Sequence, residues 1–186
     1  MLTSEEKCEL LGIARDVIGS VLQNRPSSRQ MLASEMLQKP QGAFVTIRVD
    51  GRLRGCIGYI ESEKPLVQVV AEVAEKAAFE DPRFPPLSLA EYEHSRIEIS
   101  VLTELKPVAD PEEIQVGLHG LLLETGTHKG LLLPQVAVEY GWDRYAFLDA
   151  VARKAGLTKF NKEDPELRLY VFGAEVIEEE EAVSHG

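Results

Sequence analysis

The 186-residue sequence predicts an α+β fold in which a mainly antiparallel sheet is flanked by helices. The first observation is that polar and apolar residues alternate in two paired segments, 43–60 and 116–133, as in β-hairpins. The second is that apolar residues recur at helical spacing over 4–23, over 143–155 and in the segment after Pro65. Strands and helices do not alternate regularly, which disfavours a parallel sheet.

A helix is predicted from residue 4 to residue 23. Thr3 and Glu6 form a capping-box pair in front of it. The apolar residues that follow recur at helical spacing: Leu10, Ile13, Ala14, Val17, Ile18, Val21 and Leu22. The next segment, 27–41, is expected to be a short helix or an irregular connection.

The next predicted element is a hairpin around Asp50-Gly51. A two-residue loop would pair Val49 with Arg52. A three-residue loop, with Gly51 in the left-handed conformation, would pair Arg48 with Arg52. We predict the second register because it gives one clean apolar face, and register follows the hydrophobic pattern. Its apolar face comprises Val45, Ile47, Leu53 and Ile57, and its other face comprises Phe44, Thr46, Arg48, Arg52, Arg54 and Cys56.

The rest of the chain carries similar signals. Ser88 and Glu91 form a second capping box, Asp143 is a predicted N-cap, and Gly156 is a predicted helix stop. The predicted elements are a helix between Pro65 and Asp81, a short helix over 89–93, a strand over 96–105, a helical turn over 110–113, a hairpin over 116–133, a helix over 143–155 and a strand over 167–177. The acidic end, 178–186, is expected to be a disordered tail.

Length and charge narrow the class of protein. The length suits one domain or two small lobes. The sequence has 20 Lys and Arg against 31 Asp and Glu, a formal net charge of −11. This balance disfavours a nucleic-acid-binding protein, because such proteins neutralise phosphates with basic residues. Two cysteines make no disulfide framework, and neither a signal peptide nor a membrane-spanning apolar run is visible, so we expect a cytoplasmic protein with no membrane association.

Common metal and nucleotide motifs are absent from the sequence. It contains no HExxH, no CxxC pair and no zinc-type cluster of Cys and His. It also lacks GxGxxG, the phosphate-loop form and the GxSxG nucleophile elbow. A metal site is therefore not expected, and no cofactor is assigned.

Cys56 is the candidate catalytic nucleophile. Nucleophilic attack requires the thiolate, and a nearby cation lowers the thiol pKa. Arg54 lies two residues away on the same predicted strand face and would supply that cation. Gly55 and Gly58 have no side chain, so a ligand could approach the backbone closely. The alternative is that Cys56 is a small apolar residue of the sheet, as Cys8 is expected to be within its helix.

Further candidates lie outside the hairpin. Asp81 and Arg83 follow a helix in a proline-rich loop. Arg83 could clamp a carboxylate or phosphate, or the two charges could simply pair and fix the turn. His119, on a predicted strand, could be a general base beside the thiol or a hydrogen-bonded structural histidine. Glu98 is either a carboxylate of the same site or part of a solvated strand face.

Several segments together resemble the AMMECR domain family. They are GAFVTIRVDGRLRGCIGYI (42–60), AFEDPRFPPL (78–87), RIEISVL (96–102), GLHGLLLE (117–124), GLLLPQVAVEYGWD (130–143) and KAGL (154–157), with LRGCIG as the most specific mark. The resemblance implies one domain over residues 1–177, with two unequal lobes, a cleft between them, and the larger lobe using both chain ends. It also implies a Memo-like protein and a radical-SAM protein as partners, and it implies no particular reaction.

Three hypotheses about function remain open. In the first, the protein is an enzyme: Cys56 is the nucleophile, His119 moves protons, and Arg54 and Arg83 hold a small anionic substrate. In the second, the protein is a non-catalytic binding or adaptor module for a small anionic ligand or for a Memo-like or radical-SAM partner. The third is a nucleic-acid-binding regulator, which rests on the three arginines of the predicted strand face.

Overall fold

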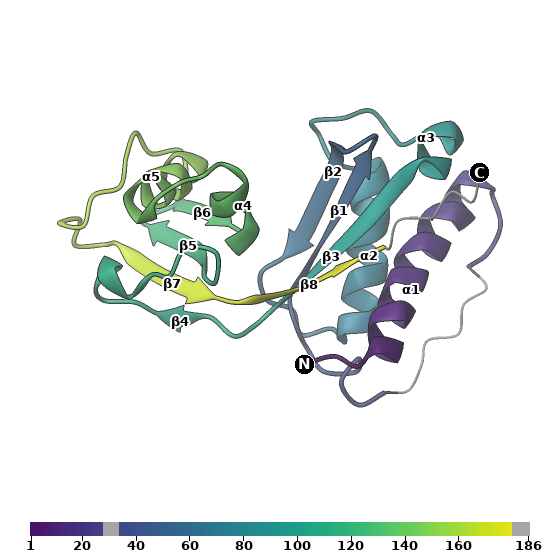
Figure 1. Ribbon diagram of the computed structural model, residues 1–186, viewed down its shortest axis with the longest axis horizontal. Coiled ribbons are helices and arrows are strands. Elements are labelled where there is room, and N and C mark those ends of the chain that lie inside the picture. The colour runs from purple at the N-terminus through teal and green to yellow at the C-terminus, as the bar shows by residue number, and fades with distance from the viewer. Residues whose placement is uncertain (28–33, 180–186) are drawn as a thin grey trace. The chain divides into compact units, whose positions relative to one another are not determined.

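The computed structural model describes residues 1–27 and 34–179, which form two compact units (Figure 1). The first unit comprises Met1–Leu102 and the chain from Glu175 onward, and the second comprises Thr103–Ala174. Each unit has its own sheet of antiparallel strand pairs, its own helices and its own apolar core, so the predicted α+β class is confirmed. No helix among the described residues is both long enough and apolar enough to cross a membrane.

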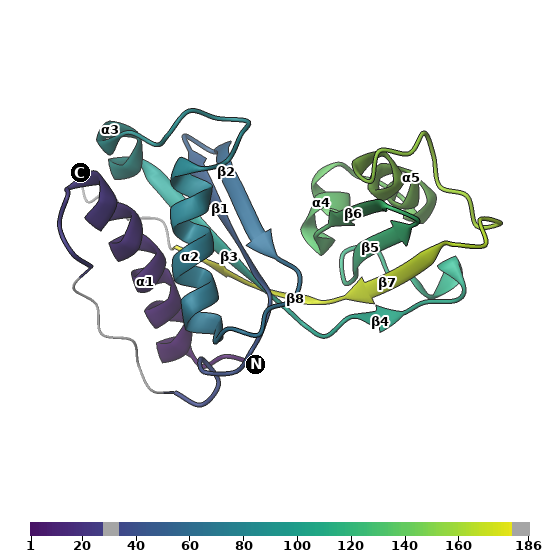
Figure 2. The same ribbon diagram turned by 180° about the vertical axis from the view of Figure 1, so that it is seen from behind.

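The first unit is a four-stranded sheet with two long helices on one face. Its strands, in the order β2-β1-β3-β8, are β2 (Arg52–Tyr59), β1 (Ala43–Val49), β3 (Ser95–Leu102) and β8 (Ala174–Glu178). The helices α1 (Ser4–Leu22) and α2 (Leu66–Phe79) lie side by side in front of this sheet in Figure 2. Apolar side chains from the two helices and from one sheet face form the core between these layers.

Capping residues set the helix starts as predicted. The Thr3 hydroxyl accepts a hydrogen bond from the backbone of Glu6, and the Glu6 carboxylate accepts one from the backbone of Thr3. Ser88 and Glu91 form the same box in front of α3 (Leu89–Glu93). Cys8 is exposed on α1, so the expectation that it packs within the helix is wrong.

The turn of the β1–β2 hairpin differs from the prediction. Asp50 (φ 50°) and Gly51 (φ 74°) are both left-handed, and Val49 lies opposite Arg52. This is a two-residue loop with the backbone of a type I′ turn, whose twist matches that of the flanking strands. The predicted pairing of Arg48 with Arg52 is therefore wrong.

A β-bulge follows this turn in β2. Arg48 lies opposite Leu53, while the next residue of β1 towards its start, Ile47, lies opposite Gly55. Arg54 is thus the extra residue, and it reverses the side-chain alternation of β2 at this point. Sequence periodicity alone could not place this reversal, because a bulge adds one residue without changing the composition of the strand.

The bulge separates residues that were predicted to share a face. Cys56 lies opposite Thr46, as the predicted face required. Leu53, predicted to be part of the apolar face, lies instead opposite Arg48 and is 38% exposed. Arg52 lies on the face of Val49, so Arg48, Arg52 and Arg54 do not form the predicted row on one strand face. The nucleic-acid hypothesis rested on that row and loses its basis.

The second unit is a smaller sheet packed against helices. Its elements are β4 (Lys106–Pro107), a 3-10 turn (Pro111–Glu113), β5 (Gly120–Thr125), β6 (His128–Leu132), α4 (Pro134–Glu139), α5 (Arg144–Lys154) and β7 (Arg168–Phe172). The strand order is β4-β7-β5-β6, and α5 packs against β5 and β6. Phe147 is fully buried at the centre of this core.

Two predicted strands are shorter than expected because the chain changes sheets within them. The strand predicted over 167–177 is divided at Gly173 into β7 in the second unit and β8 in the first. The strand predicted over 96–105 ends at Leu102. At this crossing the backbone N–H of Thr103 donates to the Gly173 carbonyl at 2.9 Å, and the Gly173 N–H donates to the Thr103 hydroxyl at 2.7 Å.

The end of the described chain is bound to the first unit. Arg15 on α1 donates to the Glu179 carboxylate through both Nε and Nη2, and to the Ser95 hydroxyl and the Tyr92 carbonyl through Nη1. Because Glu178 completes β8 and Glu179 is held in this network, the predicted disordered tail does not begin at residue 178. The remainder of that tail, 180–186, lies outside the described residues.

The connection between α1 and β1 is described only in part. Residues 28–33 of the segment predicted as a short helix or irregular connection lie outside the described residues. The remainder contains a turn and an isolated β-bridge between Pro40 and Pro65. It agrees with the second of the two alternatives.

Candidate functional site

Three of the predicted site residues meet at the free edge of β2. One oxygen of the Asp81 carboxylate accepts a hydrogen bond from the backbone N–H of Cys56 at 2.9 Å. The same carboxylate accepts from the Arg83 guanidinium, through Nη2 at 2.6 Å and Nε at 2.9 Å. Arg83 Nη2 also donates to the Cys56 carbonyl at 3.3 Å. The ion pair therefore satisfies both backbone groups of Cys56, as a neighbouring strand would.

Asp81 is the buried member of this arrangement and is only 4% exposed. The hydrogen bonds from Arg83, followed by those from the backbone, lower the pKa of Asp81 from 3.8 to about 2. Arg83 is the outer member, and 48% of its side chain is exposed. The two charges pair and fix the loop, as the structural alternative proposed, while part of the guanidinium faces solvent.

The environment of the Cys56 thiol does not favour the thiolate. Burial is the largest influence and raises the pKa of Cys56 above its ordinary value of 9.0. The Thr46 hydroxyl donates to Sγ at 3.3 Å and, with the positive charge of Arg83, opposes this rise. The negative charges of Glu98 and Asp81 add to it. Glu98 lies opposite Thr46 on β3, and so belongs to the same row of the sheet as the thiol.

Arg54 does not act on the thiol. Its guanidinium forms two hydrogen bonds with the Glu91 carboxylate, at 2.7 and 3.1 Å, and one with the Pro86 carbonyl at 3.3 Å. This pairing lowers the pKa of Glu91 from 4.5 to about 2. The expectation that Arg54 lowers the pKa of Cys56 is therefore wrong. The bulge at Arg54 explains the failure, because it places this residue outside the regular alternation that would have put it beside the thiol.

Two residues of this region were not predicted. Phe84 lies near both guanidiniums, with its ring centroid 5.4 Å from the Arg83 carbon and 5.8 Å from the Arg54 carbon. Glu91 serves at once as the N3 residue of the α3 capping box and as the partner of Arg54. The sequence signal for Phe84 was its position next to Arg83, whereas nothing local indicated that Glu91 would reach β2.

The two glycines of LRGCIG make room for the protein itself. A Cβ at Gly55 would lie less than 3.0 Å from the backbone carbonyl of Ala77 in α2. A Cβ at Gly58 would collide with the Phe44 ring and the backbone of Ala43. These spaces are therefore filled by α2 and by β1, so the predicted role of both glycines in admitting a ligand is not supported.

His119 belongs to the second unit and makes its contacts there. It lies just before β5 rather than within a strand, and its Nδ1 accepts a hydrogen bond from the backbone of Gln115 at 3.2 Å. Burial and, to a smaller extent, the positive charge of Lys106 lower the pKa of His119. These contacts match the alternative of a hydrogen-bonded structural histidine.

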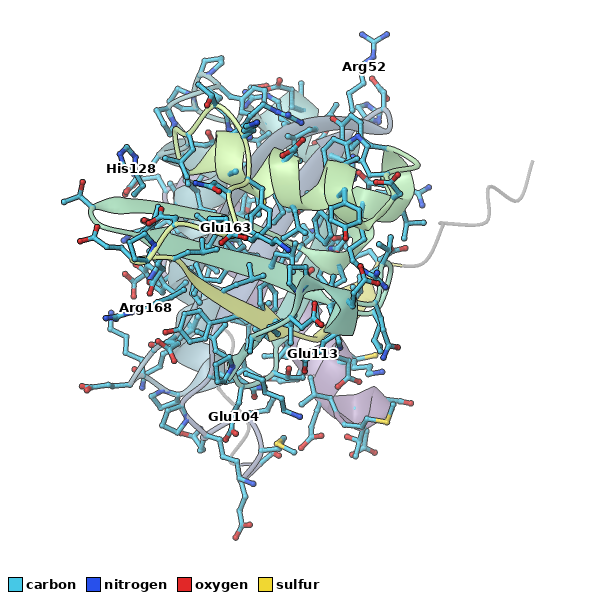
Figure 3. The ribbon with its side chains drawn as sticks, turned by 90° about the vertical axis from the view of Figure 1, so that its left-hand side faces the viewer. Arg52, Glu104, Glu113, His128, Glu163 and Arg168 are labelled. Carbon is cyan, nitrogen blue, oxygen red and sulfur yellow. The ribbon has the colours of Figure 1, made fainter. Side chains whose placement is uncertain are left out.

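The second unit also has an open hollow of about 580 Å³ at the β5–β6 turn. The hollow is lined by two segments, 124–129 and 165–168. His128 belongs to the first segment and Arg168 to the second, and both are labelled in Figure 3. The Lys129 ammonium pairs with the Glu124 carboxylate at 2.7 Å. Among the described residues, no group of three or more His, Cys, Asp or Glu is arranged to hold a metal ion.

Comparison with known proteins agrees with the family resemblance. The AMMECR1 family model matches residues 11–177. Protein MK0488 of Methanopyrus kandleri is 42% identical over 189 residues, covering 97% of this chain and 91% of that protein. A protein of Methanothermobacter thermautotrophicus is 43% identical over 188 residues, covering 96% and 97%.

A solved structure gives the same result for the fold. The crystal structure of an uncharacterized protein, PH0010 of Pyrococcus horikoshii, matches with a TM-score of 0.85 and 36% sequence identity. The match covers 92% of this chain and 90% of that one. Because the family model matches almost its whole length, the chain belongs to the AMMECR1 family.

Proposed function

We propose that this protein is a non-catalytic binding module whose recognition surface is formed by Arg83 and Phe84 against the edge of β2. The observation that carries the proposal is that both arginine candidates, Arg54 and Arg83, are paired with a carboxylate of the protein. Arg54 is held by Glu91, and Arg83 is held by Asp81. Together with a thiol pKa raised by burial, this pairing favours a fixed surface over a reactive centre.

Such a surface has the properties of a protein-binding site. Arginine and aromatic residues are enriched among the side chains that dominate binding energy. Arg83 is held in place by Asp81 before any partner arrives, which reduces the conformational entropy lost on binding. Arg83 has no hydrogen-bond partner for Nη1 among the described residues, so this group is available to a carbonyl or carboxylate of a partner.

The family resemblance implies a Memo-like protein or a radical-SAM protein as the partner, and this supplies the test. Purified Memo-like and radical-SAM proteins are each titrated against the wild-type chain and its variants. We expect Arg83→Ala and Phe84→Ala to weaken the binding of one of these partners at least about tenfold. Cys56→Ser should leave that affinity unchanged, because the thiol makes no contribution to the proposed surface.

Arg52→Ala is the matched control, because Arg52 is an exposed arginine of the same hairpin that lies outside the proposed surface. Circular dichroism of each variant checks that it is folded. This check is needed because Arg83→Ala removes the partner of the buried Asp81 carboxylate. Equal affinities for the Arg83, Phe84 and Arg52 variants would contradict the proposal, as would a complete loss of binding in Cys56→Ser.

A thiol enzyme acting on a small anionic substrate is the second candidate. The observation in its favour is that Arg83 lowers the pKa of Cys56, and that its guanidinium is partly exposed where an anion could meet it. The opposing influences on Cys56 are burial and two carboxylates, and burial is the largest influence of all. An enzyme of this kind requires a thiolate at neutral pH, so the thiol pKa separates the two candidates.

A further inference from the structure

Large apolar side chains are exposed together on the second unit. We call this set the apolar patch. It consists of Val116 (39% exposed), Leu118 (57%), Val138 (61%), Tyr140 (67%) and Tyr145 (60%). Single exposed apolar residues are ordinary on protein surfaces, but a group of them in one place marks an interaction site.

Contacts within the unit bring the three segments of the apolar patch together. A Cβ at Gly117 would lie 3.2 Å from Val138, so the loop before β5 lies against α4. Arg144, at the start of α5, donates to the Ile114 carbonyl at 3.0 Å and joins the same loop to α5. The Tyr140 ring stacks on Trp142 with 4.7 Å between ring centroids.

The surroundings of the apolar patch are acidic. Four carboxylates lie in or next to the segments that carry it, and they are Asp110, Glu112, Glu113 and Asp143. Two cations lie near them. The positive charge of Lys106 acts on His119, the residue after Leu118, and the charge of Arg144 is taken up by Glu112, which also accepts a hydrogen bond from the Tyr145 hydroxyl at 2.8 Å. The apolar side chains are thus bordered by an excess of negative charge.

We propose that the apolar patch binds an amphipathic segment of a partner protein whose apolar side chains are flanked by Lys and Arg. The apolar side chains supply the area to be removed from water, and the carboxylates select a basic partner through complementary charge. A second copy of this chain is disfavoured as the occupant, because two acidic borders and two net charges of −11 would face each other. An anionic membrane surface is disfavoured for the same reason.

The chain carries its own reporter for this binding. Trp142 is its single tryptophan, and it stacks on Tyr140 of the apolar patch. The probe is a synthetic amphipathic helix of Leu and Lys, titrated against the full chain while Trp142 fluorescence is followed. Its controls are a peptide with the same composition in an order without an apolar face, and a peptide with Glu in place of every Lys. We expect the amphipathic basic peptide to bind at least about tenfold more tightly than either control.

Variants of the apolar patch locate the site. Val138→Ser and Leu118→Ser should each weaken the binding of the amphipathic basic peptide about tenfold. Val176→Ser, an exposed apolar position of β8 in the first unit, should leave the affinity unchanged. Equal binding of the peptide without an apolar face, or patch variants that bind like the wild type, would overturn the proposal.

Two further results would also overturn it. Sedimentation that shows a dimer dispersed by Val138→Ser would assign the apolar patch to a second copy of the chain. Protection of the amides of 116–118 and 138–140 from hydrogen exchange in the free monomer would show that the chain itself covers the patch. The proposal requires a monomer in which these amides become protected only when the basic peptide is added.

Discussion

Replacing Gly55 with Ala is expected to lower the free energy of unfolding by about 3 kcal/mol or more, because overpacking a tightly packed position typically costs about 1–3 kcal/mol and occasionally more. The added Cβ would lie less than 3.0 Å from the backbone carbonyl of Ala77. A flexible side chain could move away, but here a strand of the sheet and the α2 backbone would have to separate. Urea denaturation of the wild type and the variant measures the difference.

Gly51→Asn is the matched control on the same hairpin. No atom lies within 4 Å of a Cβ at Gly51, and Asn tolerates the left-handed backbone of this turn better than most residues do. We expect this variant to lose well under about 1 kcal/mol. A Gly55→Ala variant as stable as Gly51→Asn would show that α2 does not pack against β2 in this way, and would remove the structural explanation of LRGCIG.

Replacing Asp81 with Asn is expected to destabilise the protein by about 2 kcal/mol at neutral pH, since each pH unit of pKa shift corresponds to about 1.4 kcal/mol. The folded protein lowers the pKa of Asp81 from 3.8 to about 2. A lowered carboxylate pKa stabilises the folded state above the unfolded-state pKa, and this stabilisation is lost as the pH falls. The difference between wild type and variant should therefore be full above pH 4 and should shrink as the pH falls towards 2.

Urea titrations between neutral pH and pH 2 test this dependence. Asp50→Asn is the control, because Asp50 is exposed in the hairpin turn, where Asn has the same backbone preference. Its stability difference from the wild type should be small and should not follow the pH dependence of the Asp81 variant. If the cost of Asp81→Asn stays constant from neutral pH to pH 2, the ion pair with Arg83 is not what stabilises the loop.

Local signals in the sequence predicted most helices and strands, because capping boxes and apolar spacing act over a few residues. Thr3 with Glu6, and Ser88 with Glu91, gave helix starts that the structure confirms. The predicted register of the hairpin was wrong. The two-residue turn shifts the side-chain alternation of β2 by one residue, and the extra residue Arg54 shifts it back, so Cys56 lies on the predicted face although the turn differs. The division of the last strand at Gly173 depends on which sheet each half joins, and that is a tertiary choice.

The candidate site shows the same limit. Cys56, Asp81 and Arg83 are brought together as members of one site, although Asp81 is 25 residues from Cys56 in the chain. The partner of Arg54 was missed, because Glu91 lies 37 residues away on the far side of a proline-rich loop. The sequence indicates which residue types can pair. Whether Arg54 lies beside the Cys56 thiol or the Glu91 carboxylate depends on where the proline-rich loop places Glu91, and the sequence does not give that position.

The pKa of the Cys56 thiol tests the central claim most directly, namely that LRGCIG supports a paired binding surface and not an activated nucleophile. The measurement is the rate of alkylation by iodoacetamide against pH in a Cys8→Ser background, which leaves Cys56 as the single thiol of the two that the sequence contains. Because burial raises the pKa of Cys56, we expect a midpoint above the ordinary thiol value of 9.0 and slow reaction at neutral pH. Rapid alkylation with a midpoint near or below neutrality would contradict this account and support the thiol enzyme.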